Sequence, residues 1–430
     1  MERTLVKDLK SGKEIILKGW VYEIRNLAKL GFILLRDRSG VVQCVLQNNL
    51  MDKLSDLSLE STVEIKGKTK EAKVKADYAR KELEVDVSSI EIISKAEQLP
   101  IHVNEKMTST EFQNRLDYRF LDTRKFNISA IFKIRSSIYK NIVDFFDKEQ
   151  FVIINTPKIT TIGLESGAES FVVDYFGKKT VLAQSPQFYK QMFVNGGFER
   201  VMEIGQVYRA EKSHTTRHLT EFTGIDFEMG FIQDENDVMD VAEKMFKYSI
   251  EKIKYERKEE LKLLNIDLKI PKKIPRISMG ELKEILTKKG KKLSEDDDLD
   301  AEAEKMIGEY VLEKYGEEFV FITRYPVKVR PFYHMRQDDN PKDTRSFDLL
   351  WRGVEVATGA QREHRLAILQ KQAKEKGIKI PRIYEDVFKF GVIPHGGVGL
   401  GLDRIAQRML NLENIREGLL LTRDTGRVTP

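Results

Sequence analysis

The stretch VYRAEKSHTTRHLTEFTGIDFEMG, residues 207–230, is the most informative part of this 430-residue chain. Its two flanks are rich in β-branched and aromatic residues, and they largely alternate apolar with polar side chains, as paired strands do. The connector KSHTTRH between them is basic. The sequence therefore predicts an antiparallel hairpin with cations around its turn and carboxylates interleaved along its strands.

The hairpin residues suit a ligand that is anionic at one end and forms hydrogen bonds at the other, such as a nucleoside triphosphate. Arg209 and Glu211 precede the connector, Arg217 and His218 end it, and Phe222 follows it. The pattern R-x-E, loop, R-H-x-x-E-F resembles motif 2 of the class II aminoacyl-tRNA synthetases. The resemblance covers nearly the whole chain, and within this class the chain is most similar to the aspartyl/asparaginyl group, above all to the archaeal-type aspartyl enzymes.

Composition sets the broad class of protein. With 41% hydrophobic and 33% charged residues, the chain reads as soluble and globular, with two or three domains. It has no apolar run near the roughly 18 residues of a membrane span, and its N-terminus has no apolar signal region. We therefore expect a cytoplasmic protein that does not bind membranes. Its single cysteine, Cys44, excludes an intramolecular disulfide and a cysteine-ligated zinc site.

The expected fold class is α+β, with an N-terminal β-barrel domain over residues 1–100. Short strand-like runs alternate with turns there, and the helix-like segment NNLMDKLSDLS lies between the third and fourth strands. This order is typical of an OB-fold, a common module for binding single-stranded nucleic acid. The resemblance makes it the anticodon-binding domain.

Four residues of this domain are expected to contact the tRNA anticodon. Phe32 offers a ring for stacking, Gln43 an amide that reads a base edge, and Arg25 a nearby cation. The resemblance implies that the aromatic and the glutamine meet the base that the two related tRNAs share. Tyr22 occupies a position where enzymes of narrow and wide tRNA range are expected to differ, and a tyrosine does not decide between them.

After a polar hinge over residues 101–125, the rest of the chain, 126–430, is expected to form a class II catalytic domain, an antiparallel sheet flanked by helices. A helix is predicted over residues 127–148, followed by a strand that carries Pro157. These two elements resemble motif 1, which implies a homodimer, and a proline in a strand indicates an edge or interface position. Residues 257–318 read as a charged, helix-rich insertion. Its acidic run, 295–298, is expected to be a solvated helix start rather than a metal site.

Charging a tRNA takes two steps: a carboxylate attacks the α-phosphate of ATP, and a tRNA hydroxyl then attacks the activated carbonyl. Arg209 is the expected catalytic residue, because its planar guanidinium can hold the carboxylate and the α-phosphate together. The resemblance implies that Glu211 accepts from the adenine amino group, that Phe222 lies beneath the adenine, and that Arg217 and His218 meet the outer phosphates.

The segment HGGVGLGLDRIAQRML, residues 395–410, resembles motif 3. It implies that Arg404 opposes Phe222 across the adenine or reaches the γ-phosphate. Between motifs 2 and 3, the resemblance implies that Glu355 and Thr358 hold the Mg²⁺ that bridges the ATP phosphates, with Asp348 in support. Thr358 stands where a serine is more usual, and it keeps the hydroxyl.

A buried substrate carboxylate must be paired with cations. Lys190, in LAQSPQFYKQM, and Arg362, in GAQREHR, are the candidates, with Asp226 expected to balance them and to orient Lys190. The resemblance implies that Glu165 binds the substrate α-ammonium, with Glu169 as a substitute, although Ser166 beside it replaces a common glycine. The predicted aspartate-binding set is Glu165, Ser185, Gln187, Lys190, Asp226, Thr358 and Arg362.

The function expected from this resemblance is activation of L-aspartate with ATP and its transfer to tRNA(Asp), with an acceptor range that can extend to tRNA(Asn). An asparaginyl-tRNA synthetase is the first alternative, but an amide substrate has no need of Lys190. A lysyl enzyme would require acidic residues in place of Lys190 and Arg362. A tRNA-independent asparagine synthetase would lack the N-terminal barrel. A nucleic-acid-binding relative with an inactive core would have lost the ATP residues, and these are present.

Overall fold

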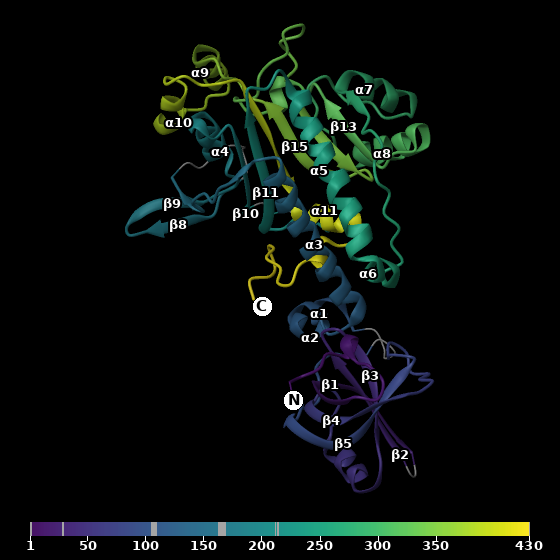
Figure 1. Ribbon diagram of the computed structural model, residues 1–430. Coiled ribbons are helices and arrows are strands. Elements are labelled where there is room, and N and C mark those ends of the chain that lie inside the picture. The colour runs from purple at the N-terminus through teal and green to yellow at the C-terminus, as the bar shows by residue number, and fades with distance from the viewer. Residues whose placement is uncertain are drawn as a thin grey trace. The chain divides into compact units, whose positions relative to one another are not determined.

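The structure is a computed structural model, and its chain divides into two units, Met1–Asp122 and Thr123–Pro430 (Figure 1). The residues that it describes are 2–27, 30–104, 110–161, 169–210, 212 and 215–429. Two predicted site residues, Glu165 and Glu211, lie outside the described residues.

The first unit is built around a closed barrel of five strands in the order β1-β2-β3-β5-β4. Buried residues alternate with more exposed ones along β1 and β4, so that one face of each strand fills the barrel. The short helix η2 lies between the third and fourth strands, where the sequence predicted a helix, but it is a 3-10 helix. The predicted OB-fold is thereby confirmed. The elements of the barrel are η1 (Val6–Asp8), β1 (Glu14–Leu27), β2 (Leu30–Asp37), β3 (Gly40–Leu46), η2 (Asn48–Asp56), β4 (Thr62–Glu71) and β5 (Leu83–Ser94).

Two short helices, α1 (Phe112–Asp117) and α2 (Arg119–Asp122), occupy part of the segment predicted as a hinge, residues 101–125. Arg119 and Asp122 are both buried, and they form an ion pair at 2.6 Å. The division between the two units falls directly after Asp122. Hinge motion in this segment stays a prediction.

An eight-stranded sheet in the order β12-β13-β14-β15-β16-β11-β10-β6 forms the centre of the second unit. Its inner neighbours pair antiparallel, as predicted, whereas the outer pairs β12–β13 and β10–β6 are parallel. A separate three-stranded sheet has the order β7-β9-β8. The strands are β6 (Val152–Ile153), β7 (Ile159–Thr160), β8 (Val172–Tyr175), β9 (Lys178–Leu182), β10 (Arg200–Tyr208), β11 (Glu221–Gly230), β12 (Arg276–Ser278), β13 (Phe319–Thr323), β14 (Ser346–Trp351), β15 (Glu355–Gln361) and β16 (His395–Gly401).

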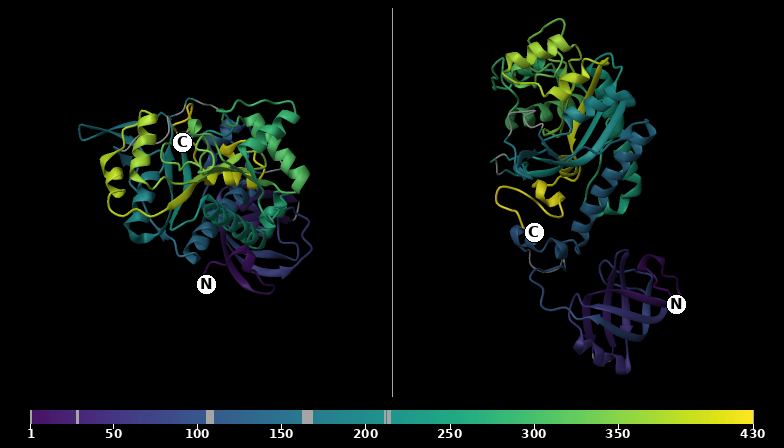
Figure 2. Two further views of the ribbon diagram at one scale, coloured as in Figure 1. Left: turned by 90° about the horizontal axis from the view of Figure 1, so that it is seen from above. Right: turned by 90° about the vertical axis from the view of Figure 1, so that its left-hand side faces the viewer.

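The long helices α3 (Phe126–Lys148) and α5 (Glu235–Glu256) lie side by side against one face of the large sheet (Figures 1 and 2). Isoleucines spaced three and four residues apart on α3 point to the sheet, and they share one core with the apolar face of α5. Asp234 caps the start of α5 by accepting a hydrogen bond from the backbone of Asn236. The other helices of this unit are α4 (Gln187–Phe193), η3 (Val194–Phe198), α6 (Lys258–Leu263), α7 (Met279–Lys288), α8 (Ala301–Tyr315), η4 (Val327–Val329), α9 (Leu366–Glu375), α10 (Arg382–Val387), α11 (Leu402–Met409) and η5 (Ile415–Gly418).

The segment after α3, predicted as one strand with Pro157 inside it, is instead two short strands in different sheets. β6 pairs with β10 at the edge of the large sheet, and β7 pairs with β9. Pro157 lies between them and has no N–H group to donate to a sheet ladder. The backbone beside it is held by a side chain, because Glu203 accepts hydrogen bonds from the Thr156 backbone and from Lys158.

Residues 257–318, predicted as a helix-rich insertion, contain α6, α7 and α8, but they also contribute the edge strand β12 to the large sheet. Ser278 and Glu281 form a capping box at the start of α7, and Asp300 caps α8. This segment is therefore packed onto the catalytic sheet, and its bounds as an insertion stay a prediction. Among the described residues, no helix is long and apolar enough to cross a membrane.

Candidate active site

The predicted hairpin is formed by β10 and β11, which pair antiparallel from Arg200 opposite Met229 to Tyr208 opposite Glu221. Arg209 follows β10 directly, and its backbone N–H donates to Thr220 across the mouth of the loop at 2.9 Å. The Arg209 guanidinium lies 5.4 Å from the centre of the Phe222 ring. The hairpin thus brings a cation and an aromatic ring together at one end of the sheet.

A cavity of about 430 Å³ opens at this end of the sheet, and β10, β11, β15 and β16 all contribute to its wall. Most of the predicted ATP and aspartate residues line it, and the structure therefore gathers them into one site. Those that line it are Ser185, Gln187, Arg209, Arg217, His218, Phe222, Asp226, Glu355, Thr358, Arg362 and Arg404. Lys190 is buried behind the wall, and Asp348 is buried next to Glu355.

Arginines from α11 and from the hairpin loop line one part of the cavity. Arg404, in the first turn of α11, donates to the backbone carbonyl of Glu355 at 3.1 Å and contacts its carboxylate at 3.3 Å. Arg217 reaches across to α8, where its Nη1 atom lies 3.1 Å from Glu304 Oε2. Burial, reinforced by repulsion from Glu355, raises the pKa of Glu304 to about 7. No sequence pattern predicted that α8 supplies a carboxylate to this site.

The residues predicted to hold Mg²⁺ lie on β14 and β15. The register places Asp348 opposite Thr358 and Leu350 opposite Glu355. The turn between β14 and β15 therefore brings Asp348 and Glu355 to the same side of the sheet. Arg330 binds Asp348 Oδ2 at 2.5 Å, and Asp348 Oδ1 is buried without a hydrogen-bond partner among the described residues. Burial and the nearby Asp348 carboxylate raise the pKa of Glu355. Two carboxylates and a hydroxyl supply the oxygen donors that Mg²⁺ prefers, and the Asp348 oxygen without a partner among the described residues fits a ligand to a cation.

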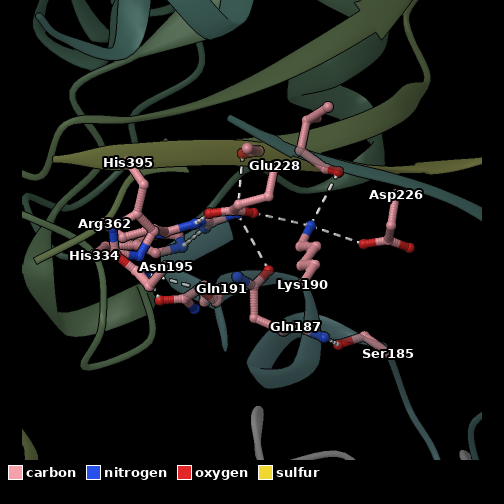
Figure 3. Close-up of polar contacts among 12 residues, drawn as sticks. Ser185, Gln187, Lys190, Gln191, Asn195, Asp226, Glu228, His334, Arg362 and His395 are labelled. Carbon is pink, nitrogen blue, oxygen red and sulfur yellow. Dashed lines mark hydrogen bonds and ion pairs between the residues drawn. The ribbon is translucent and has the colours of Figure 1, made fainter. Parts of the chain in front are cut away.

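Another part of the cavity wall holds a cluster of four buried charges, drawn in Figure 3. Lys190 Nζ donates to Asp226 Oδ1 at 2.8 Å and to the Val398 carbonyl at 3.1 Å, and it lies 3.4 Å from Glu228 Oε2. Arg362 binds both oxygens of Glu228, at 2.8 and 3.1 Å. The two cations and two carboxylates cancel, so the pocket is neutral rather than positive as the predicted residues alone would make it.

Glu228 is the main residue of this cluster that the predicted set omits. Burial alone would raise its pKa, but Arg362 and Lys190 outweigh burial and lower it. Its position could have been inferred from the sequence, because residues 226 and 228 on one strand face the same side. The opposing strand β16 makes room for it: a Cβ on Gly397 would lie 2.1 Å from Glu228 Oε2. Gly397 of β16 therefore leaves room for the Glu228 carboxylate.

His334 also belongs to this pocket and was not predicted. It is buried on the cavity wall, and its Nε2 atom lies 3.2 Å from Arg362 Nη1. Burial and the neighbouring Arg362 lower the pKa of His334 well below its usual value, so that the ring is neutral. With Nε2 accepting from Arg362, the proton is on Nδ1. His334 belongs to no local motif, so only the fold could place it here.

The acidic run at 295–298 lies at the edge of the same cavity. It was predicted to be a solvated helix start, and α8 does begin just after it, at Ala301. Asp298 is exposed, as the prediction has it, but it also lines the cavity, where desolvation raises its pKa. Among the described residues there is no group of three or more His, Cys, Asp or Glu arranged to hold a metal ion. A cation in this cavity would therefore depend on ligand oxygens in addition to protein ones.

In the first unit, three of the four predicted anticodon residues share the outer face of the barrel wall. Arg25 is paired opposite Phe32, and Gln43 is paired opposite Leu34, two residues along the same strand. The Gln43 amide donates to Glu84 at 2.7 Å. Tyr22 is only 2% exposed and packs against Arg36, so the structure does not bring it to this surface.

Comparison with known protein families agrees with this geometry. Residues 111–425 match the family described as tRNA synthetases class II (D, K and N), and residues 15–93 match the family described as OB-fold nucleic acid binding domain.

Individual relatives match over almost the full chain. The "Aspartate--tRNA(Asp/Asn) ligase" of Aeropyrum pernix is 45% identical, over 99% of this chain and 97% of its own length. The "Aspartate--tRNA(Asp) ligase" of Pyrococcus abyssi is 42% identical, over 98% and 97%. Among solved structures, asparaginyl-tRNA synthetase from Pyrococcus horikoshii, complexed with asparaginyl-adenylate, has a TM-score of 0.93 at 31% identity, with 100% of each chain covered.

Proposed function

Because this chain belongs to the class II tRNA synthetases of the D, K and N group, we propose that it is an aspartate–tRNA ligase. It would activate L-aspartate with ATP, release pyrophosphate, and transfer the aspartyl group to the 3′ end of tRNA(Asp). The observation that carries the choice of aspartate is the pair of buried cations, Lys190 and Arg362, at the amino-acid end of the cavity. The archaeal relatives named as aspartate ligases support it.

In the activation step, an oxygen of the aspartate α-carboxylate attacks the α-phosphorus of ATP, and the bond from that phosphorus to pyrophosphate breaks. Arg209 would hold the two anions together, because its guanidinium can donate to both through parallel hydrogen bonds. The Arg209 guanidinium lies over the Phe222 ring, and this contact supports the role because it orients the guanidinium. The same ring would carry the adenine. Arg217, His218 and Arg404 would neutralise the outer phosphates.

Mg²⁺ would be held by Glu355 and Thr358, with Asp348 in support, and when bound it would neutralise charge that develops on the phosphates. The buried Asp348 Oδ1 atom without a partner and the raised pKa of Glu355 support a cation at this place. Arg330 keeps Asp348 in position through its other oxygen.

The aspartate side chain would be bound by one Arg362 donor that the pocket itself does not use, with the charge of Lys190 beside it. Arg362 spends its Nε and Nη2 groups on Glu228, Gln187 and Gly397, and one Nη1 hydrogen on His334. Its second Nη1 hydrogen has no partner within the described part of the chain. Lys190, held by Asp226, would supply the second positive charge. An asparagine amide would place its own N–H donors against these cations, and this disfavours the asparaginyl alternative.

The tRNA is a partner of this family, and the OB-fold domain would read its anticodon through Phe32, Gln43 and Arg25. We propose tRNA(Asp) as the acceptor. A range that includes tRNA(Asn) is the second candidate, and the name of the Aeropyrum pernix relative favours it. A cytoplasmic location belongs to the same proposal, because tRNA charging serves translation there.

A homodimer is part of the proposal, and exposed apolar side chains in two segments support it. Val152 and Ile153 of the edge strand β6 are 40% and 49% exposed. The hairpin of β8 and β9, which projects from the second unit in Figure 1, carries Val172 at 65% and Phe176 at 89% exposed. Apolar surface of this kind on a strand edge marks an interaction site. Sedimentation of the chain and of an Ile153→Asp variant tests it, with the variant expected to be monomeric.

The proposed function is tested by charging tRNA transcripts with labelled aspartate in magnesium buffer. We expect acid-stable label on the tRNA(Asp) transcript and none with labelled asparagine. Label on the tRNA(Asn) transcript as well would establish the wider range. Charging with asparagine alone would contradict the proposal, and no charging of either transcript with either amino acid would favour the inactive-core alternative.

A further inference from the structure

The loop that carries Arg217 and His218 needs support from outside its own hairpin. Strand pairing between β10 and β11 ends at Tyr208 and Glu221, before the loop begins. Beyond the bond from Arg209 to Thr220, the backbone of the described part of the loop, residues 215–220, bonds to the end of the chain. The Ile415 N–H donates to the Thr216 carbonyl at 3.0 Å, and the Thr220 N–H donates to the Arg423 carbonyl at 3.0 Å.

A side chain from the same C-terminal segment adds a third bond to the loop. Arg416 Nη1 donates to the Thr215 carbonyl at 3.1 Å. The three bonds reach residues 215, 216 and 220, and thus bracket Arg217 and His218 from both sides. We call residues 413–424 the C-terminal strap. In Figure 1 it belongs to the yellow end of the chain.

Arg416 is held in a fixed orientation. The residue is 5% exposed, its Nε donates to Asp424 Oδ2 at 2.6 Å, and the side chains of both partners are more than nine-tenths buried. Asn414 Oδ1 accepts from the Arg416 backbone at 3.1 Å and caps the short helix η5. Burying an ion pair in this way costs desolvation free energy and does not by itself stabilise a fold. It does fix the guanidinium, and therefore the position of the Thr215 carbonyl.

We propose that the C-terminal strap positions the outer-phosphate cations of the active site, with Arg416 as the positioning residue. Arg416 acts through the main chain of residues 215–216 and does not itself touch the nucleotide. Ile415, beside it, is buried and lines the same cavity as Arg217 and His218, so the strap is continuous with the wall of the site. The strap holds the main chain beside Arg217, and Glu304 holds its guanidinium by accepting a hydrogen bond from Nη1. The strap and α8 together would keep Arg217 extended toward the phosphates before ATP arrives.

Loss of the strap should change the KM for ATP and not the KM for aspartate. The proposed function enters this test only through the choice of aspartate as the amino acid in the assay. Arg416→Gln removes the bond to Thr215 and the ion pair to Asp424. The KM for ATP in pyrophosphate exchange should rise by about tenfold or more, the effect expected for losing a charged hydrogen bond. The KM for aspartate should change by less than about twofold, a difference of about 0.4 kcal/mol, because the three bonds described above run from the strap to the loop and not to the aspartate pocket.

Matched variants separate positioning from general stability. Arg416→Lys keeps the charge beside Asp424 and should restore much of the affinity for ATP. Arg382→Gln removes an arginine whose side chain is 94% exposed and should leave both KM values unchanged. A rise of both KM values together in Arg416→Gln, or a lowered melting temperature with an unchanged KM for ATP, would overturn the proposal.

A second readout does not depend on amino-acid activation. Stabilisation of the full chain against thermal unfolding by ATP with magnesium should be smaller in Arg416→Gln than in the parent chain at equal ATP concentration. If the parent chain shows no aspartate-dependent exchange but is stabilised by ATP, the proposed function fails while the strap is still tested. Equal stabilisation of the two chains by ATP would refute the strap.

Discussion

Replacing Lys190 by methionine tests the buried charge cluster most severely. The change keeps the length of the side chain and removes its charge, leaving Asp226 without its cation and Glu228 with Arg362 alone. At an effective dielectric constant of about 20, the lost attractions are about 6 kcal/mol at 2.8 Å and about 5 kcal/mol at 3.4 Å. Part of this is offset because Lys190 no longer pays for desolvation, so the expected loss of unfolding free energy is about 3–5 kcal/mol.

The unfolding assay must report on the second unit alone. This is possible because the chain has two tryptophans, one in each unit. Trp20 lies on β1 and Trp351 is buried at the end of β14. In a Trp20→Phe background, Trp351 fluorescence during urea unfolding follows the catalytic unit. The double variant Lys190→Met/Asp226→Asn should recover part of the loss, because it removes the stranded carboxylate as well. The exposed Lys389→Met serves as control and should change stability by less than about 0.5 kcal/mol.

The same variants make a kinetic prediction. Lys190→Met should raise the KM for aspartate by roughly 10- to 100-fold, the range for a lost hydrogen bond to a charged group, and leave the KM for ATP near its parent value. Stability within about 1 kcal/mol of the parent chain, or a double variant less stable than the single one, would refute the account of Lys190 as the cation that Asp226 and Glu228 require.

Three further predictions concern the rest of the site. The pKa of Glu304, raised to about 7, means that the folded state holds this proton more tightly than the unfolded state, so stability is lost as pH rises from about 4.5 to 7. Urea unfolding at pH 5 and pH 8 should therefore show a smaller difference in Glu304→Gln, by up to about 3 kcal/mol, and an unchanged difference would contradict the assigned pKa. Phe222→Ala should weaken ATP binding by roughly 10-fold through loss of the stacking surface, as measured by titration calorimetry, whereas equal affinity would place the adenine elsewhere. Gly397→Ala should cost about 1–3 kcal/mol of unfolding free energy, because the new methyl group overlaps Glu228 and the Phe227 carbonyl; a neutral effect would mean that β16 can shift away from β11.

The parts of the site that the sequence predicted are those that local pattern determines. The alternation of residues 201–230 predicted two paired strands, and the structure pairs them in register. Arg209 and Phe222 flank the loop in sequence and therefore also meet in space. The barrel was predicted from the order of its short strands, its turns and the helix between the third and fourth strands, which is also local information.

The contributions that the sequence did not predict come from residues brought in by long-range packing. His334 and Glu304 lie far along the chain from the β10–β11 hairpin, and no local periodicity links them to it. Asp298 lies in a charged run whose composition is that of a solvated surface. The two short strands around Pro157 were merged into one, because a proline does not reveal from sequence which sheet each side joins.

The net charge of the pocket also could not be predicted in full from the sequence. Lys190 and Arg362 were predicted as partners of a substrate carboxylate, but the structure compensates both with Asp226 and Glu228. The prediction included Asp226 as a balancing charge but not Glu228, and it therefore overstated the positive charge of the pocket. Selectivity for aspartate must then depend on the directions of the remaining donors, and the pocket geometry supplies these.

The most direct test of the central claim is exchange of labelled pyrophosphate into ATP, with aspartate and asparagine compared side by side in magnesium buffer and with tRNA added in a parallel series. The account predicts exchange with aspartate and not with asparagine. Exchange with asparagine alone would contradict it, because the buried cations Lys190 and Arg362 would then not select a carboxylate.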